Sequence, residues 1–189
     1  MDTYKNTMRR KMRSRQAQSI AELPMGLWFL LIGFFIPLLG LATFGYKIAQ
    51  VYWATKDAAY VASVTSTYDP STGPPACVGM KVAADNVFAN DMAGFNATGA
   101  IGTHTLQILQ KTVGSTGAPV IVTPPLAKGS LNVTTYIYFA RYVTVSNIPP
   151  FLGSGWKYAW FPAIAGLNAP LTVQLSYDDY VENPNGLTI

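Results

Sequence analysis

The chain has 189 residues, of which 50% are hydrophobic and only 12% are charged, whereas ordinary soluble domains carry about 25% charged residues. Its net charge of +4 is local, because residues 1–15 hold six bases and one acid, while the chain after Lys56 holds five bases and seven acids. Nucleic-acid binding needs bases spread along a face, so this distribution excludes that partner and favours a topogenic signal or anionic-lipid contact. The length leaves room for one modest domain beside a membrane segment.

An uninterrupted run of 24 uncharged residues extends from Leu23 to Tyr46. A helix of that length spans about 36 Å and can cross a hydrocarbon core of about 30 Å. Secretory signal peptides have shorter apolar regions followed by a small-x-small cleavage site, so we interpret the run as a retained anchor. The positive-inside rule places residues 1–20 in the cytoplasm and the C-terminal part outside. Aromatic residues near the two ends suit interfacial anchoring, namely Trp28, Tyr46, Tyr52 and Trp53.

Proline and glycine modulate this run. Pro24 fits the first turn of a helix, whereas Pro37 lies in mid-span, where its missing N–H predicts a kink or a locally melted turn. Gly26, Gly33 and Gly40 recur every seven residues. They form either a smooth stripe against which another helix packs or the ordinary glycine content of a membrane helix, and the sequence leaves both interpretations open.

The helical pattern continues beyond the apolar run. Small and apolar side chains recur there at three- to four-residue spacing on one face, namely Ile48, Val51, Thr55, Ala58, Ala59 and Ala62. One helix from about residue 19 to about residue 66 would be roughly 70 Å long. We expect half of it to lie in lipid and half to project outward.

The remainder of the chain predicts a small α+β head. Residues 81–95 have a helical pattern that stops at Gly94. β-branched or alternating patterns predict three or four antiparallel strands with one buried face, at 104–114, 118–124, 131–146 and 170–181. The fold class is therefore α+β, in which a transmembrane helix, extended by an amphipathic helix, precedes a small antiparallel sheet. The expected parts are a basic leader (1–17), the membrane and projecting helix (18–66), a linker (67–80) and an extracytoplasmic head (81–189).

The sequence contains few residues that suggest a catalytic or metal-binding site. His104 is the only histidine, no nucleophile elbow surrounds it, and we interpret it as a surface loop residue. Asp178, Asp179 and Glu182 lack the spacing of metal ligands and are interpreted as a solvated strand end. Cys77 is alone, so an intrachain disulfide is excluded. No catalytic, cofactor or metal site is assigned, and we expect no enzyme.

An aromatic cluster lies late in the chain and comprises Trp156, Tyr158, Trp160 and Phe161. Packing in a core or an interface is the favoured interpretation. The other interpretation, an exposed platform, supports an alternative function for the whole chain. In that alternative the protein is a membrane-tethered extracytoplasmic module that binds a ligand or a surface.

Glu22 stands at the mouth of the apolar run, where an unpaired carboxylate in lipid costs a few kcal/mol. One explanation is a solvated first-turn acid that interacts favourably with the helix dipole, worth about 0.3–1 kcal/mol. The other requires an assembly, in which Glu22 of one subunit meets the N-terminal amine of a neighbour after the basic arm has been removed. Burial would then let this charge pair fix the axial register of the subunits.

Residues 9 to about 64, including RSRQAQSIAELPMGLWFLL and YWATKDAAYVAS, resemble the TadE-like pilus-assembly proteins of the tight-adherence system, which are type IV pilin-like. The strand region is similar to that family only in kind. The family shares a basic leader, a Glu just inside a long apolar helix, an Ala-rich continuation and a compact αβ head. Glu22 matches the acid of this motif.

The resemblance implies a processing site and a set of partners. A membrane peptidase would cut after Ala17, where the family usually has Gly, and leave Gln18 as the new N-terminus. The implied function is structural, as a pseudopilin or minor pilin anchored in the bacterial inner membrane. The implied partners are membrane lipid, copies of the chain, related pilin-like subunits, the pilus assembly machinery and a prepilin peptidase.

Overall fold

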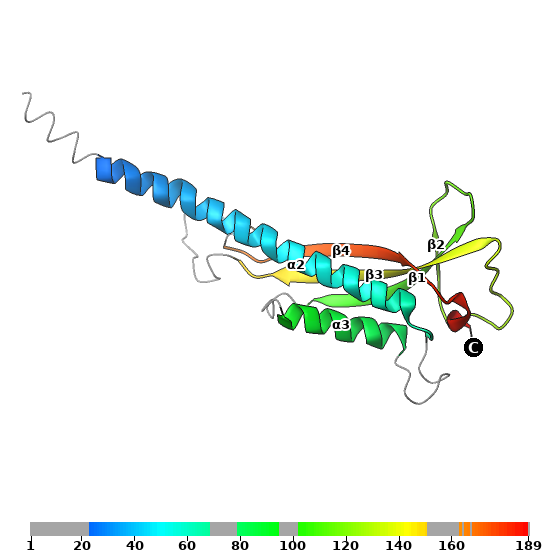
Figure 1. Cartoon of the computed structure of the whole chain (residues 1–189). Coiled ribbons are helices and arrows are strands. Elements are labelled where there is room, and N and C mark those ends of the chain that lie inside the picture. Colours follow the sequence, from blue (N-terminus) through cyan, green and yellow to red (C-terminus); the bar gives the residue numbers. More distant parts are fainter. Residues whose placement is uncertain are drawn as a thin grey trace, which may run out of the picture. The chain divides into compact units, whose positions relative to one another are not determined.

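The computed structural model describes residues 23–68, 79–94, 102–150, 163, 165–166 and 168–188. One long apolar helix comes first, and a short helix and a four-stranded antiparallel sheet follow it (Figure 1). The α+β fold class expected from the sequence is therefore confirmed. By its internal contacts the chain divides into two compact units, and the boundary falls between Thr43 and Phe44.

The first helix is continuous from Leu23 to Val64. Its early turns are α-helical, a π-helix η1 covers Leu31–Phe35, and α2 covers Ile36–Val64. The single helix predicted past the end of the apolar run is thus present. The boundary between the compact units lies inside α2, so its two halves belong to different units.

The π-helix has a direct cause in Pro37. Proline has no N–H with which to bond the carbonyl four residues earlier, here that of Gly33. In the turn before it, the Ile36 N–H donates to the Leu31 carbonyl, five residues back. This wider turn is the π-helical pattern. Of the two predicted alternatives, a kink or a melted turn, the melted turn is therefore wrong, because the chain stays helical through a π-turn.

From Phe44 onward α2 buries a face of small side chains. The most deeply buried members have no exposed surface and belong to the core of the second unit: Val51, Ala54, Ala58, Ala59 and Ala62. On the same face the Thr55 hydroxyl donates to the Val51 carbonyl over 2.7 Å and lies 3.2 Å from the Thr144 hydroxyl in the sheet. Small residues let a helix backbone approach its neighbour closely. The half of α2 that begins at Phe44 is therefore part of the core of the head. The amphipathic pattern in the sequence did not by itself predict this packing.

A second helix, α3, covers Met80–Gly94 and ends at the predicted glycine. Its buried residues recur every four positions and form one face, namely Met80, Ala84, Phe88 and Met92. These side chains join the same core as the alanine face of α2. Four-residue spacing keeps these side chains on one side of the helix. The short helix predicted at residues 81–95 is confirmed by α3.

The sheet contains four antiparallel strands in the order β2-β1-β3-β4, with bounds Thr103–Thr112 for β1, Val120–Val122 for β2, Tyr136–Ile148 for β3 and Leu171–Tyr180 for β4. All four predicted strands exist with shifted ends. In β3 every second residue from Tyr138 to Ile148 is buried. Tyr138, Ala140 and Tyr142 share the core with α2 and α3, so both helices cover one face of the sheet.

The residues that follow α2, and those that follow β2, form hydrogen bonds with residues near the C-terminus. The Tyr68 N–H donates to the Gly186 carbonyl over 2.9 Å, and the Leu126 N–H donates to the Leu187 carbonyl over 2.7 Å. Gly186 and Leu187 belong to the short 3-10 helix η3, Pro184–Leu187. The end of the sheet that carries the β1–β2 connection therefore lies near the Val64 end of α2, away from Phe44 (Figure 1).

Candidate functional site

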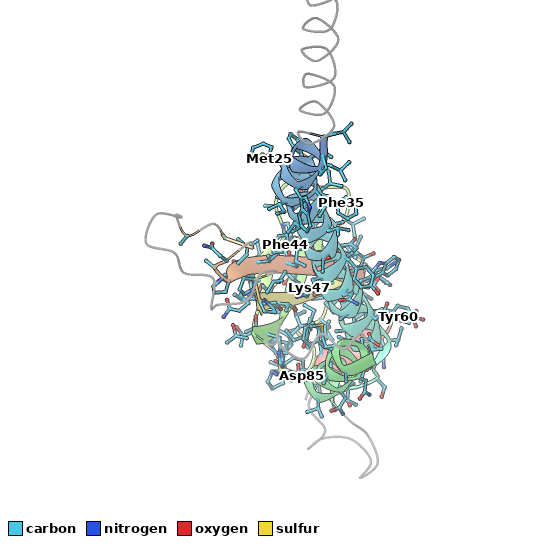
Figure 2. The ribbon with its side chains drawn as sticks, turned by 90° about the vertical axis from the view of Figure 1, so that its left-hand side faces the viewer. Met25, Phe35, Phe44, Lys47, Tyr60 and Asp85 are labelled. Atoms are coloured by element: carbon cyan, nitrogen blue, oxygen red, sulfur yellow. The ribbon has the colours of Figure 1, made fainter. Side chains whose placement is uncertain are left out.

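Large apolar side chains are exposed along the helix from Leu23 to Leu41. Their exposed fractions reach 79% at Phe29 and 78% at Met25, and Figure 2 shows Met25 and Phe35 on this part of the helix. Monomeric soluble proteins rarely expose apolar patches of this extent. Among the described residues one helix, Leu23–Val64, is long and apolar enough to cross a membrane, and only 6% of its most apolar window is buried.

The predicted processing and assembly residues Ala17, Gln18 and Glu22 lie outside the described residues, and their roles stay predictions. The glycines of the predicted packing stripe fall on the helix. A Cβ placed on Gly26 or Gly33 would meet no heavy atom within 4 Å, whereas Gly40 is buried. Gly33 also lies inside the π-turn, which changes the angular spacing of the residues along the helix. Close packing at Gly26 and Gly33 therefore has open space, but no described segment occupies it.

The head-bound half of α2 carries an aromatic stripe, which we define as Tyr46, Trp53 and Tyr60. Seven residues make almost two helical turns, so these three side chains lie on one face. Their exposed fractions are 64%, 51% and 54%. The opposite face holds the buried alanines, and Figure 2 shows Tyr60 on the side of α2 away from the strands. The stripe is therefore a surface that the head itself does not cover.

Neighbouring groups hold Trp53 in place while half of it stays exposed. The Lys56 Nζ lies 4.9 Å from the centre of the Trp53 ring and 6.0 Å from that of Tyr177 in β4. Tyr52 meets both Trp53 and Tyr177 edge to face, with ring centres 6.4 and 6.2 Å apart. Cation–π and edge-to-face contacts of this kind restrict an aromatic ring without burying it. The stripe thus has an ordered centre.

His104 lies in β1 and not in a surface loop, so that expectation is wrong. Its side chain is 28% exposed, and Nε2 lies 3.3 Å from Oδ1 of Asp85 in α3. The Tyr142 hydroxyl donates to the same oxygen over 2.9 Å, and Lys81 pairs with the other carboxylate oxygen. Burial, followed by the hydrogen bond and charge of Asp85, raises the pKa of Tyr142 above its ordinary value of 10.0, so the phenol remains a donor. The network ties α3 to the sheet.

Asp178, which the sequence placed at a solvated strand end, is bound by a base that the sequence analysis missed. The Arg141 Nε and Nη2 donate to Oδ1 and Oδ2 of Asp178 over 2.6 and 2.7 Å. The two residues are direct partners in the β3–β4 ladder. This bidentate pair uses both oxygens of Asp178. No group of three His, Cys, Asp or Glu side chains that could hold a metal occurs within the described ranges.

Asp91 in α3 is a partly buried carboxylate that the charge of Asp57 in α2 reaches. One oxygen of Asp91 in α3, Oδ2, is buried and has no hydrogen-bond partner among the described residues. Burial first, and the charge of Asp57 in α2 second, raise the pKa of Asp91 above its ordinary value of 3.8. The pair is a local electrostatic cost and supplies too few oxygens for a cation site.

The aromatic cluster at residues 156–161 and Cys77 lie outside the described residues. The aromatic stripe was within reach of the sequence, because the seven-residue recurrence from Tyr46 to Tyr60 is visible there. From the sequence we instead expected Tyr46 and Trp53 at the lipid interface. No protein-family model matches this chain, and neither does any curated protein or any solved structure.

Proposed function

We propose that the protein is a structural or assembly subunit of a type IV-like tight-adherence pilus, as a pseudopilin or minor pilin. In this proposal it is anchored in the bacterial inner membrane by its single apolar helix, with the N-terminus in the cytoplasm and the head outside. Its partners are copies of itself, related pilin-like subunits and the assembly machinery. The observation that carries the proposal is the aromatic stripe.

A simple membrane tether needs exposed apolar surface only where the helix is in lipid. The apolar surface of this helix continues onto the head-bound half, where charged residues return as Lys47, Lys56 and Asp57. Half-exposed Trp and Tyr side chains are typical of residues that dominate the binding energy of protein interfaces. We therefore assign the stripe to helix–helix contacts between subunits.

The N-terminal part of the proposal concerns processing and register. A prepilin peptidase cuts after Ala17, and the new amine of Gln18 pairs with Glu22 of a neighbouring subunit. This buried pair fixes the axial offset between helices. Gly26 and Gly33, where a Cβ would meet open space, then let neighbouring helices approach within the membrane.

Site-directed disulfide cross-linking in native membranes tests the proposed interface. The background is Cys77→Ser, and single cysteines replace Tyr46, Trp53 or Tyr60. Control cysteines replace Val82 and Ala89, which are exposed on α3. We expect oxidation to give disulfide dimers at the stripe positions and none at the α3 positions. Equal cross-linking on α3, or none at the stripe, would contradict subunit contact through the stripe.

A piliation assay separates assembly from tethering. Trp53→Ser is compared with Tyr180→Ser, because both side chains are 51% exposed in the native protein. Loss of an interfacial tryptophan typically costs about 2 kcal/mol or more, so we expect at least about a tenfold loss of surface pili for Trp53→Ser and no loss for Tyr180→Ser. Glu22→Ala should also abolish pili while the protein still inserts in the membrane. Unchanged piliation in Trp53→Ser and Glu22→Ala would support the membrane-tethered binding module instead.

A further inference from the structure

One row of side chains crosses the whole sheet and is exposed at both of its ends. The strand registers place four residues in this row, namely Ile121, Leu109, Phe139 and Tyr180. The row lies on the face opposite α2 and α3, because Phe139 alternates with the buried Tyr138. The Phe139 and Tyr180 rings meet edge to face, with ring centres 6.4 Å apart. At the two edges of the sheet, Ile121 in β2 is 57% exposed and Tyr180 in β4 is 51% exposed.

The main chain is unpaired at both ends of this row. The Val181 N–H donates to the Tyr138 carbonyl over 3.0 Å. Because hydrogen-bonded pairs alternate along an antiparallel ladder, the N–H and C=O of Tyr180 point away from β3. That N–H donates to Oδ1 of Asp179, its own neighbour in the chain, over 2.9 Å. The same alternation, carried across β3 and β1, points the N–H and C=O of Ile121 away from β1. Within the described residues no further strand pairs with either edge.

The two edges fit each other in direction. Each neighbouring pair of strands is antiparallel, so β2 and β4 run in opposite directions. A second copy that is shifted sideways, without being turned over, places its β2 antiparallel to β4 of the first copy. Ile121 of one copy then lies opposite Tyr180 of the other, and the row continues from sheet to sheet. Copies inserted the same way in one membrane need no inversion to pair like this, whereas pairing β4 with β4 would invert one of them.

The charges beside the two edges are also complementary. Lys111 follows Leu109 by two residues, so it lies on the face of the row and near the β2 edge. Glu182 follows Tyr180 by two residues and is exposed beyond the end of β4. Neither residue makes an ion pair within the part of the chain that the structure describes. In the sideways arrangement their main chains are two strand spacings apart, about 10 Å, a distance that the two side chains together can span.

We propose that the edges of the sheet pair between copies of this chain, β2 of one copy with β4 of the next. Ile121 and Tyr180 exchange main-chain hydrogen bonds, and Lys111 pairs with Glu182. The contact joins two different surfaces, and a heterologous contact of this kind repeats into a ring or a filament. The inference deepens the proposed function and rests on it in one respect, namely that copies lie side by side in one membrane. It assigns the sheet edges to a second copy, separately from the aromatic stripe.

Disulfide cross-linking of the full-length protein in native membranes tests this pairing. The background is Cys77→Ser, and one chain carries both Ile121→Cys and Tyr180→Cys. Within one copy these positions are three strand spacings apart, about 14 Å, which is too far for an intrachain disulfide. We expect oxidation to give a ladder of dimers, trimers and longer species, and each single variant to stay monomeric. Main-chain bonds carry the pairing, so cysteine at either position, or serine in place of Tyr180, should preserve it.

A matched control and a charge exchange sharpen the test. Val133→Cys replaces Ile121→Cys in the control, because Val133 is 56% exposed but lies in the turn before β3. We expect no ladder from Val133→Cys combined with Tyr180→Cys. Lys111→Glu should lower the yield of the ladder at least about threefold, because it places two acids at the contact. Adding Glu182→Lys should restore the yield to within about twofold, as a double-mutant cycle requires of a direct pair.

Three outcomes would overturn the edge pairing: no ladder, an equal ladder from the Val133 control, or dimers from either single variant. If Glu182→Lys does not rescue Lys111→Glu, the proposed ion pair is wrong. Cross-linking along the aromatic stripe is a separate measurement. Stripe dimers without a ladder would overturn the edge pairing alone, whereas the loss of both would also contradict the proposed function.

Discussion

The two halves of the first helix differ in what surrounds them and in the size of the side chains they present. From Leu23 to Thr43 the helix exposes large apolar residues and has no charged one. From Phe44 to Val64 it buries alanines against the head and carries Lys47, Lys56 and Asp57. Hydropathy alone would merge the two halves into one apolar helix. The size of the side chain and the face on which it lies separate them.

Under the proposed function, this contrast gives each half of the helix a different partner. A bilayer is fluid and needs no shape complementarity, so bulky Leu, Phe and Met side chains suit its surface. A folded sheet is closely packed, so its contact face selects residues such as Ala54, Ala58 and Ala62. The aromatic stripe belongs to neither surface, because it is exposed on the half that is packed against the head. That combination is why we assign it to another protein.

The strongest way to break this comparison is a charge in the apolar half. An aspartate at the centre of a membrane helix costs about 3 kcal/mol in insertion free energy. Phe34→Asp should therefore reduce membrane insertion strongly, as measured by alkaline extraction of membranes and by protease protection of the head.

Val82→Asp is the control for that change, because Val82 is exposed on α3 in the head. A substitution on a water-facing surface should change stability by about 0.5 kcal/mol or less and leave insertion intact. If Phe34→Asp inserts as well as Val82→Asp does, the exposed half of the helix does not lie in lipid.

Enlarging one alanine tests the head-bound half. Ala58 has no exposed surface and contributes to the core, so Ala58→Leu should overpack it and cost about 1–3 kcal/mol. For a unit of this size we expect the melting temperature of the head to fall by about 3–10 °C. The measurement is thermal unfolding in detergent, followed by near-ultraviolet circular dichroism.

The same substitution on the exposed side of α2 provides the matched control. Ala49 is exposed, so Ala49→Leu should change the melting temperature by no more than about 2 °C. Equal destabilisation at the two positions would show that the buried alanine face does not depend on small side chains.

Local patterns in the sequence predicted the elements of this fold well. The alternation of Leu171, Val173, Leu175 and Tyr177 predicted β4, and the stop at Gly94 predicted the end of α3. Both signals depend on neighbours in the sequence, and both were confirmed. The predicted amphipathic face of α2 was also confirmed, since Val51, Ala58 and Ala62 are buried.

Contacts between distant parts of the chain could not be predicted in the same way. The bond from Tyr142 to Asp85 joins residues 57 positions apart, and the Arg141–Asp178 pair joins residues 37 apart. Each pair forms only with one particular strand register or one placement of a helix on the sheet. The same helices and strands could be arranged in many other ways in which these residues would not meet. The predicted strand at 104–114 already contained His104, but its interpretation as a surface loop residue was wrong, because its partners come from α3 and β3. The π-turn was missed for a different reason. Pro37 removes one backbone hydrogen bond, and a helix can respond to that loss either by unwinding locally or by forming a wider π-helical turn.

A smaller effect concerns the charges that the head-bound half of α2 tolerates. The pKa of Asp91 is raised chiefly by burial and secondarily by the charge of Asp57. A raised pKa means that the folded protein holds its proton more tightly than the unfolded chain does. As the pH rises above the ordinary value of 3.8 and through the raised pKa, the folded state therefore loses stability.

Asp91→Asn removes the charge and should stabilise the head at pH 7, by about 0.5 kcal/mol or less because the site is only partly buried. The gain in melting temperature over the native protein should shrink as the pH is lowered and vanish below about pH 3.8, where Asp91 is protonated in both folded and unfolded chains. Asp57→Asn should give a smaller gain, since it relieves only the secondary cause. If Asp57→Asn stabilises the head more than Asp91→Asn does, repulsion between α2 and α3 outweighs burial. In that case repulsion between charges on α2 and α3, rather than the loss of water around a buried carboxylate, would limit which charged residues this half of the helix can carry.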